Sequence, residues 1–173
     1  LMKSPDFGKS VETMVRALTY VTDHSSIDAV PTIKNGNDQA HTIGLGGMGL
    51  HTMFATNQMH YGSPESIEFT DIYFMLLNYY TLAASNKIAK ERGEAFVNFN
   101  KSSYYTGEYF DAYTDSDVVF QSEKVKHIFE GIKVPTKEDW LQLKQAVRES
   151  GLYHQNRLAI APTGSISYVN ETS

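Results

Sequence analysis

The chain has 173 residues and a formal net charge of −5, with 41% apolar residues, 20% charged residues and no cysteine. This composition suits a globular domain, or a large part of one, and excludes disulfides, thiolate metal sites and cysteine nucleophiles within the chain. It shows no basic face for nucleic acid, no apolar run near the ~20 residues that span a bilayer and no signal-peptide pattern, so we expect a cytoplasmic protein without nucleic-acid or membrane partners.

The N-terminal part of the chain is predicted to form one helix followed by a break. Ser10 is a good N-cap residue. Apolar residues recur after it at helical spacing, namely Val11, Met14, Val15, Leu18 and Val21. Residues 25–38 then interrupt this pattern with Pro31 and the turn-forming pair Asn35 and Gly36. We therefore expect a helix that ends before an irregular segment.

The longest predicted element is a helix from about Ser66 to Arg92. Apolar side chains cover most of its circumference, which is typical of a helix buried on several sides. A narrow polar strip remains, formed by Asp71, Asn78 and Ser85. At 1.5 Å per residue the helix would be roughly 40 Å long, more than a compact domain of this size comfortably encloses. This length and the start at Leu1 lead us to expect a segment of a longer polypeptide.

Two shorter helices and one strand are predicted in the C-terminal part. The helices lie near residues 122–130 and 137–150. Thr136 and Asp139 approximate a capping box before the second of them, and Gly151 suits the position after its end. The only convincing buried strand covers residues 157–161, and it leads into the turn of residues 162–167.

That turn has the features of an anion-binding site. Gly164 has no Cβ, so backbone amides can approach a ligand closely, and the next residues can open a helix. The first N–H groups of a helix form a donor cluster with a partial positive charge. The hydroxyls of Thr163, Ser165 and Ser167 can add donors. An ordinary polar turn that caps a helix explains the same residues, so the pattern alone leaves both interpretations open.

Residues 156–170, with the string Pro162-Thr163-Gly164-Ser165-Ile166-Ser167, closely resemble the substrate-phosphate stretch of ribonucleotide reductase large subunits. The likeness is greatest to the manganese- or iron-dependent class Ib enzymes of bacteria. Residues 41–50 resemble the same family's glycine-rich helical segment, and the long helix and residues 96–105 also fit. The resemblance implies an α/β fold in which residues 1–173 are a single partial domain, a mainly helical fragment of the family's ten-stranded α/β barrel that ends in a barrel strand and the phosphate loop.

The resemblance also implies the role of the loop. In this family the loop holds the diphosphate of a ribonucleoside diphosphate, mainly through main-chain amides. Carried over by position, the substrate-binding residues are Pro162, Thr163, Gly164, Ser165 and Ile166. Ser167 is a weaker candidate.

Several parts of the enzyme are implied to lie outside this chain. The family reduces ribonucleoside diphosphates to deoxyribonucleoside diphosphates for DNA synthesis through a cysteine thiyl radical, so a chain without cysteine is expected to hold no catalytic residue and to be inactive alone. The Asn-Cys-Glu motif and the allosteric nucleotide site are expected before Leu1, and a tyrosine pair and shuttle cysteines after Ser173. The full enzyme is implied to be a homodimer that works with a thiol reductant and a small β subunit carrying a dimetal (manganese or iron) tyrosyl radical, with no metal or cofactor in this chain.

Two other functions remain as alternatives. Residues 44–49 match the dinucleotide-binding pattern G-x-G-x-x-G, but no strand is predicted before them, and close helix packing explains the glycines as well. A helical module without a ligand would instead bind a partner through the aromatic residues between 96 and 113. We interpret the tyrosine pairs at 79–80 and 104–105 as packing rather than radical transfer. The six scattered histidines do not have the spacing of metal ligands.

Overall fold

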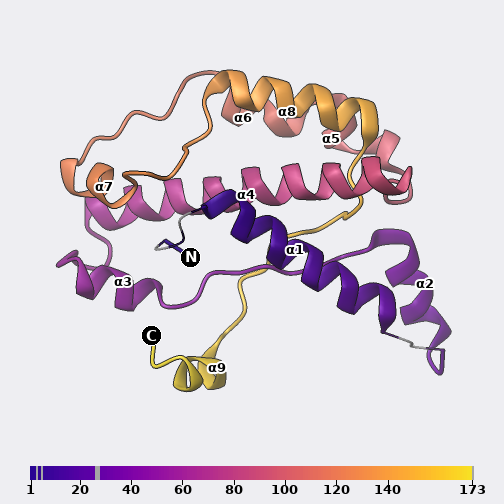
Figure 1. The fold of residues 1–173 in the computed structure, drawn as a ribbon, viewed down its shortest axis with the longest axis horizontal. Helices are drawn as coiled ribbons and strands as arrows, with labels where there is room; N and C mark the ends of the chain where they lie inside the picture. Colours follow the sequence, from indigo (N-terminus) through magenta and orange to yellow (C-terminus); the bar gives the residue numbers. More distant parts are fainter. Residues whose placement is uncertain (3, 5, 26–27, 173) are drawn as a thin grey trace.

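The computed structural model describes residues 1–2, 4, 6–25 and 28–172, which form layers of helices (Figure 1). The three longest helices, α1 (Phe7–His24), α4 (Pro64–Arg92) and α8 (Lys137–Ser150), lie in successive layers with α4 in the middle. The shorter elements are α2 (Pro31–Ala40), α3 (Leu50–Thr56), η1 (Phe99–Lys101), α5 (Ser103–Thr106), η2 (Glu108–Phe110), α6 (Asp111–Thr114), α7 (Glu123–Ile128) and α9 (Gly164–Val169). None of the helices described is long and apolar enough to cross a membrane.

Helix α4 is buried on two sides, as its sequence predicts. Toward α1, Leu76 belongs to a core cluster that also contains Val11. Toward α8, Leu82 belongs to a second cluster that contains Trp140. The helix begins after Ser63, whose hydroxyl accepts the N–H of Ser66 at 3.3 Å. Because α4 carries apolar side chains all round, it supplies both clusters at once and holds the outer helices in place.

The predicted helix at residues 137–150 is confirmed as α8, with its caps. The Thr136 hydroxyl accepts the N–H of Asp139 at 3.2 Å, and the Asp139 carboxylate accepts the N–H of Thr136 at 2.9 Å. This reciprocal pair satisfies two N–H groups that the first helical turn leaves free. Gly151, which follows the helix, has a φ of 78°, a conformation that favours glycine.

The predicted start of the first helix is wrong by one turn. The carboxylate of Asp6 accepts the N–H of Lys9 at 2.8 Å, so Asp6 is the N-cap and α1 begins at Phe7. Ser10, the predicted cap, lies inside the helix, where its hydroxyl bonds that of Ser4 at 2.6 Å. Asp and Ser are equally good N-cap residues, so the apolar pattern alone did not decide between them.

The break predicted around Pro31 and Asn35–Gly36 is also wrong, because these residues form α2. Pro31 occupies the first turn of the helix, where its missing N–H costs nothing. Lys34 pairs with Asp38 at 2.6 Å, four residues along, which supports the helix from its surface. No residue of α2 is buried, so its sequence lacks the apolar periodicity by which helices are recognised.

Residues 41–49, which the resemblance implied to be helical, form no helix, and the predicted strand at 157–161 pairs with them at one point. An isolated parallel bridge joins Leu45 and Leu158. The N–H of Leu45 donates to the carbonyl of Arg157 at 2.8 Å, and the N–H of Ala159 donates to that of Leu45 at 3.1 Å. The N–H of Ile43 also donates to the Asn156 carbonyl at 3.1 Å, but the pairing does not extend beyond a single bridge, and a strand needs a partner over several residues. Within the described ranges the chain is therefore mainly helical, as predicted for the fragment, while the predicted final strand is limited to this bridge.

Candidate functional site

The predicted phosphate loop stands apart from the helical body, by which we mean the described residues before Ile160, with helices α1 to α8 (Figure 1). Ile160, just before the loop, is 92% exposed. Helix α9 begins at Gly164 and has no buried residue. A Cβ built on Gly164 would meet nothing within 4 Å. The five predicted residues at 162–166 therefore lie together in one open turn on the surface.

The start of α9 leaves three successive N–H groups pointing out of the first helical turn. The first helical hydrogen bond of α9 joins the N–H of Ser167 to the carbonyl of Thr163 at 3.0 Å. The N–H groups of Gly164, Ser165 and Ile166 precede it and have no acceptor inside the helix. No side chain caps them. Such a group of donors, at the positive end of a helix, is suited to an anion.

Thr163 has an unusual backbone conformation at this turn. Its φ is 50° and its ψ is 12°, in the left-handed region. A β-branched residue is rare there because its side chain crowds the backbone, and such strain is concentrated at ligand sites. Gly164 itself has no positive φ, so the glycine is not required by its own backbone.

The hydroxyl of Ser167 was predicted as an additional donor, and it is already used. It donates to the carbonyl of Gly164 at 2.7 Å. Ser167 therefore shapes the turn from inside, which agrees with its lower rank among the candidate residues. The chain after α9 returns to the helical body, since a Cβ at Gly49 would lie 3.3 Å from the Cβ of Thr172.

An apolar cavity of about 590 Å³ lies beside the loop. Ile160 lines it on the loop side, and Tyr73 and Phe74 of α4 line it on the other. Gly47 and Met48 of the glycine-rich segment complete this wall. The open turn is thus close to a space with room for a small molecule.

The glycine-rich pattern at 44–49 serves packing, as predicted, although its partners are not only helices. A Cβ on Gly44 would lie 2.9 Å from that of Ala159, and one on Gly46 would collide with the Ala159 carbonyl oxygen. A Cβ on Gly47 would lie 3.3 Å from the ring of Tyr73. Because the chain's own atoms occupy these positions, the glycines allow close approach of protein backbone, and the geometry gives no support to a dinucleotide site.

Most aromatic residues between 96 and 113 are buried or half-buried, and Tyr105, at 40%, is the exposed one. Phe110 is fully buried, and Tyr113 stacks on Trp140 of α8 at 4.2 Å between ring centroids. The tyrosine pair on α4 is divided between two partners, Tyr79 against Trp140 at 4.9 Å and Tyr80 against Phe7 at 5.7 Å. These rings mainly fill volume between α4 and its neighbours. They do not form the exposed aromatic surface that the interaction-module alternative requires.

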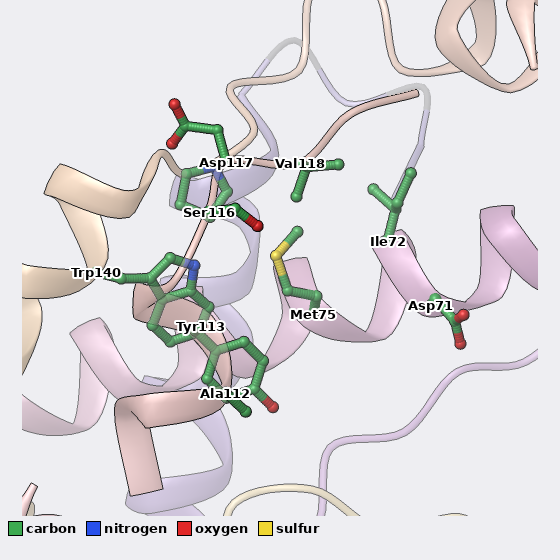
Figure 2. A pocket seen from close by; sticks show the side chains of 10 residues that line it. Asp71, Ile72, Met75, Ala112, Tyr113, Ser116, Asp117, Val118 and Trp140 are labelled. Carbon is green, nitrogen blue, oxygen red and sulfur yellow. The ribbon is translucent and has the colours of Figure 1, made fainter. Parts of the chain in front are cut away.

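A second cavity, of about 340 Å³, lies where α4 faces residues 112–118 (Figure 2). Met75 and Ile72 of α4 lie on one side, across from Val118 and Trp140. The carboxylate of Asp117 is engaged outside it, where it accepts the N–H of Lys137 at 2.6 Å. The walls are thus apolar for the most part, which suits a gap between packed layers better than a site for a charged substrate.

His154, which the sequence presents as an isolated histidine, is fully buried and joins three segments. Its Nε2 lies 2.9 Å from the Thr19 hydroxyl, and its Nδ1 lies 3.0 Å from that of Ser85. Thr19 donates its own proton to the Val15 carbonyl, so Nε2–H must donate to Thr19, and Nδ1 accepts from Ser85. Burial, together with the nearby Arg157 charge, lowers the pKa of His154 to about 4. The sequence alone does not reveal that His154 connects these segments.

In the described portion of the chain, no three or more His, Cys, Asp or Glu side chains are grouped as they would be around a metal ion.

Comparison with known proteins identifies the family. Residues 2–173 match the protein family described as "Ribonucleotide reductase, barrel domain". The chain is 43% identical, over its whole length, to the ribonucleoside-diphosphate reductase subunit alpha of Bacillus subtilis (strain 168), of which it covers 25%. It is 39% identical to the same subunit of Mycoplasma pneumoniae, and the match covers 96% of this chain and 24% of that relative. It is 31% identical to the same subunit of Helicobacter pylori, and the match covers 97% of this chain and 20% of that relative.

The chain thus spans about a quarter or less of the length of these curated relatives. The match includes both unusual features of the fold, the glycine-rich segment and the open turn before α9. This chain belongs to the ribonucleotide reductase family, within its barrel domain.

Proposed function

We propose that this chain is the part of a ribonucleoside-diphosphate reductase α subunit that binds the diphosphate of the substrate. The observation that carries the proposal is the set of uncapped N–H groups at Gly164, Ser165 and Ile166, on an open turn. With Pro162 and Thr163, these are the residues at which the family's phosphate loop is expected. The family membership gives the substrate class, and the turn gives the chemistry that recognises it.

A diphosphate suits this turn because main-chain donors bind phosphate oxygens without a lysine or arginine. The partial positive charge at the start of a helix adds to the three N–H groups. Thr163 has a left-handed backbone conformation and directs the chain into α9. In this proposal the arrangement of N–H donors that results offsets the backbone strain of Thr163. The cavity beside Ile160 gives the remainder of a bound molecule a place next to the body.

The remaining steps of the reaction belong to other parts of the enzyme in this proposal. Residues 1–173 contain no cysteine, so the thiyl radical and the reducing cysteine pair are supplied elsewhere in the α polypeptide. A radical-generating β subunit with a manganese or iron dimetal centre, a thiol reductant and a second α subunit complete a cytoplasmic enzyme. The chain forms a single partial domain of the catalytic barrel and, assayed alone with the β subunit, is expected to give no turnover.

Replacement of Ser165 by aspartate in the full-length α subunit tests the phosphate site. Aspartate is favourable in the first turn of a helix, so α9 is expected to persist, while its charge repels the diphosphate. We expect the KM for a ribonucleoside diphosphate to rise about tenfold or more, which corresponds to roughly 1.4 kcal/mol. The matched control is Ser165→Asn, of nearly equal size and without charge, for which a much smaller increase is expected.

The two variants together decide the proposal. Equal KM values for Ser165→Asp, Ser165→Asn and the wild type would show that no anion binds at this turn. An equal loss of activity in both variants would point to a steric role of Ser165 and would likewise count against phosphate binding.

A further inference from the structure

Arg157 is the most deeply buried charged side chain of the body, with only 4% of its surface exposed. It lies in the segment that pairs with the glycine-rich residues, where its carbonyl accepts the N–H of Leu45. A cation in such a position normally has a carboxylate partner, because removal of an unpaired charge from water is very costly.

Two more exposed arginines have such a partner, and Arg157 does not. Arg16 pairs with Glu91 at 2.7 Å, and Arg92 pairs with Asp23 at 2.7 Å. Among the residues described, no carboxylate lies within 4.0 Å of the guanidinium of Arg157. Its Nε is buried without any hydrogen-bond partner.

Within the described part of the chain, the hydrogen-bond acceptor of this guanidinium is a phenol. Both terminal nitrogens of Arg157 donate to the hydroxyl of Tyr104, each at 3.3 Å, and the guanidinium carbon lies 5.1 Å from the centre of that ring. These two bonds use the acceptor capacity of the oxygen and leave its proton to donate. The neighbouring Tyr109, 4.4 Å from Tyr104 between centroids, donates its own proton to Asn78 at 2.8 Å.

The group is therefore rich in donors and lacks an acceptor. Arg157 Nε–H and the Tyr104 O–H are both available, and the positive charge is uncompensated. A cavity of about 370 Å³ is lined by Leu158, which follows Arg157 in the chain, and by Tyr109, which packs on Tyr104, while Arg157 and Tyr104 themselves do not line it. We propose that Arg157 and Tyr104 form the donor half of an anion site that takes a carboxylate or phosphate group.

This site is distinct from the turn before α9. It uses side-chain donors of residues 104 and 157, whereas the turn uses the main-chain amides of 164–166, so either can fail without the other. The anion has two possible sources, a free oxyanion or a carboxylate from a part of the polypeptide outside these residues. Both sources supply anionic oxygen acceptors for Arg157 and Tyr104. They differ in one respect: a carboxylate of the longer polypeptide would already fill the site in an intact α subunit.

The proposal is tested by measuring the midpoint temperature of thermal unfolding of the chain in inorganic phosphate, in acetate and in chloride at the same ionic strength. The chloride value is the reference. If the site binds an anion, a concentration of about ten times the dissociation constant is expected to raise the midpoint by roughly 3 °C. Arg157→Met is expected to abolish this rise, and Tyr104→Phe to reduce it by at least half. Arg148→Met, the same change at an exposed arginine, is expected to leave the rise intact.

The same titration on the intact α subunit distinguishes the two sources. A rise in the chain and in the intact subunit identifies a free oxyanion as the ligand. A rise in the chain alone identifies a carboxylate of the longer polypeptide, which already fills the site. No rise in the chain, or a rise that persists in Arg157→Met, overturns the proposal. An experimental structure of the intact subunit with tungstate gives an independent decision, because water alone around the guanidinium would also overturn it.

Discussion

The helical body and the C-terminal stretch, residues 160–172, differ in whether polar groups have hydrogen-bond partners and in whether apolar side chains are buried. In the body, even the buried imidazole of His154 has a hydrogen-bond partner at each ring nitrogen. In the C-terminal stretch, the apolar side chains of Ile160, Tyr168 and Val169 are 92%, 86% and 78% exposed. Three N–H groups at the start of α9 also lack a cap there. Among the described residues of the body, the Arg157 Nε is the one buried side-chain nitrogen or oxygen without a partner, whereas the C-terminal stretch leaves main-chain donors and apolar side chains exposed.

This difference predicts where substitutions act. Changes in the body are expected to lower the free energy of unfolding, because buried groups there, with the exception of the Arg157 Nε–H, have lost water and gained a protein partner. Changes in the C-terminal stretch are expected to alter binding and to leave stability almost unchanged. Measurements of unfolding in the two regions therefore test whether the comparison holds.

The largest effect is expected for Trp140→Ala. Trp140 is 2% exposed and contacts the rings of Tyr79 and Tyr113 between α4 and α8. Its removal leaves a large cavity, so the free energy of unfolding in urea is expected to fall by about 3–5 kcal/mol. The control is Leu141→Ala at the next position, where the side chain is 40% exposed and a loss of at most about 1 kcal/mol is expected. Equal losses would show that α8 is not packed as described.

The second effect concerns pH. The pKa of His154 is about 4 in the folded chain and about 6.5 in the unfolded chain. Between these values the unfolded chain binds more protons, so stability is complete above pH 6.5 and is lost as the pH falls toward 4. The loss from this group is expected to reach roughly 3 kcal/mol. Urea unfolding at pH 7.5 and pH 4.5 measures it, and His154→Gln is expected to flatten the difference. An unchanged difference in that variant would assign the pH dependence to other groups.

The third effect removes one partner of the same imidazole. Ser85→Ala leaves both Nδ1 and the main-chain N–H of His154 without the hydroxyl that they share. Unsatisfied buried groups cost about 1–3 kcal/mol, so a loss of about 2 kcal/mol in urea unfolding is expected at neutral pH. Ser103→Ala, at an exposed serine of α5, is the matched control and is expected to change stability by less than about 0.5 kcal/mol.

The elements that the sequence predicts well are those whose signals are local. The caps of α8 and the apolar circumference of α4 are encoded within a few residues, and both are found as predicted. The exposed helix α2 was missed because it buries no residue and relies on surface pairs such as Lys34 with Asp38. The predicted strand at 157–161 was reduced to one bridge because a strand depends on distant partners, which no local pattern specifies.

The candidate sites divide in the same way. The turn at 162–166 was found from its small residues and its string, and the opening of a helix at Gly164 is confirmed. Its phosphate role stays a prediction. The buried positions of Arg157 and His154 were not predicted, because a lone charged residue in a sequence carries no sign of whether it is exposed. Their significance comes from three-dimensional neighbours such as Tyr104 and Ser85.

The smallest effect is expected in the C-terminal stretch, where the same substitution can be compared directly with one in the body. Tyr168→Ser removes an 86% exposed ring, so the free energy of unfolding is expected to change by less than about 0.5 kcal/mol. The same substitution at Tyr153, which is 3% exposed and bonds Asp23 and Arg92, is expected to cost about 3 kcal/mol. Urea unfolding of both variants measures the two losses in the free energy of unfolding, so they can be compared directly. A loss above about 1 kcal/mol for Tyr168→Ser would mean that α9 is part of the packed body, and the open turn would then have to be explained by packing instead of by binding.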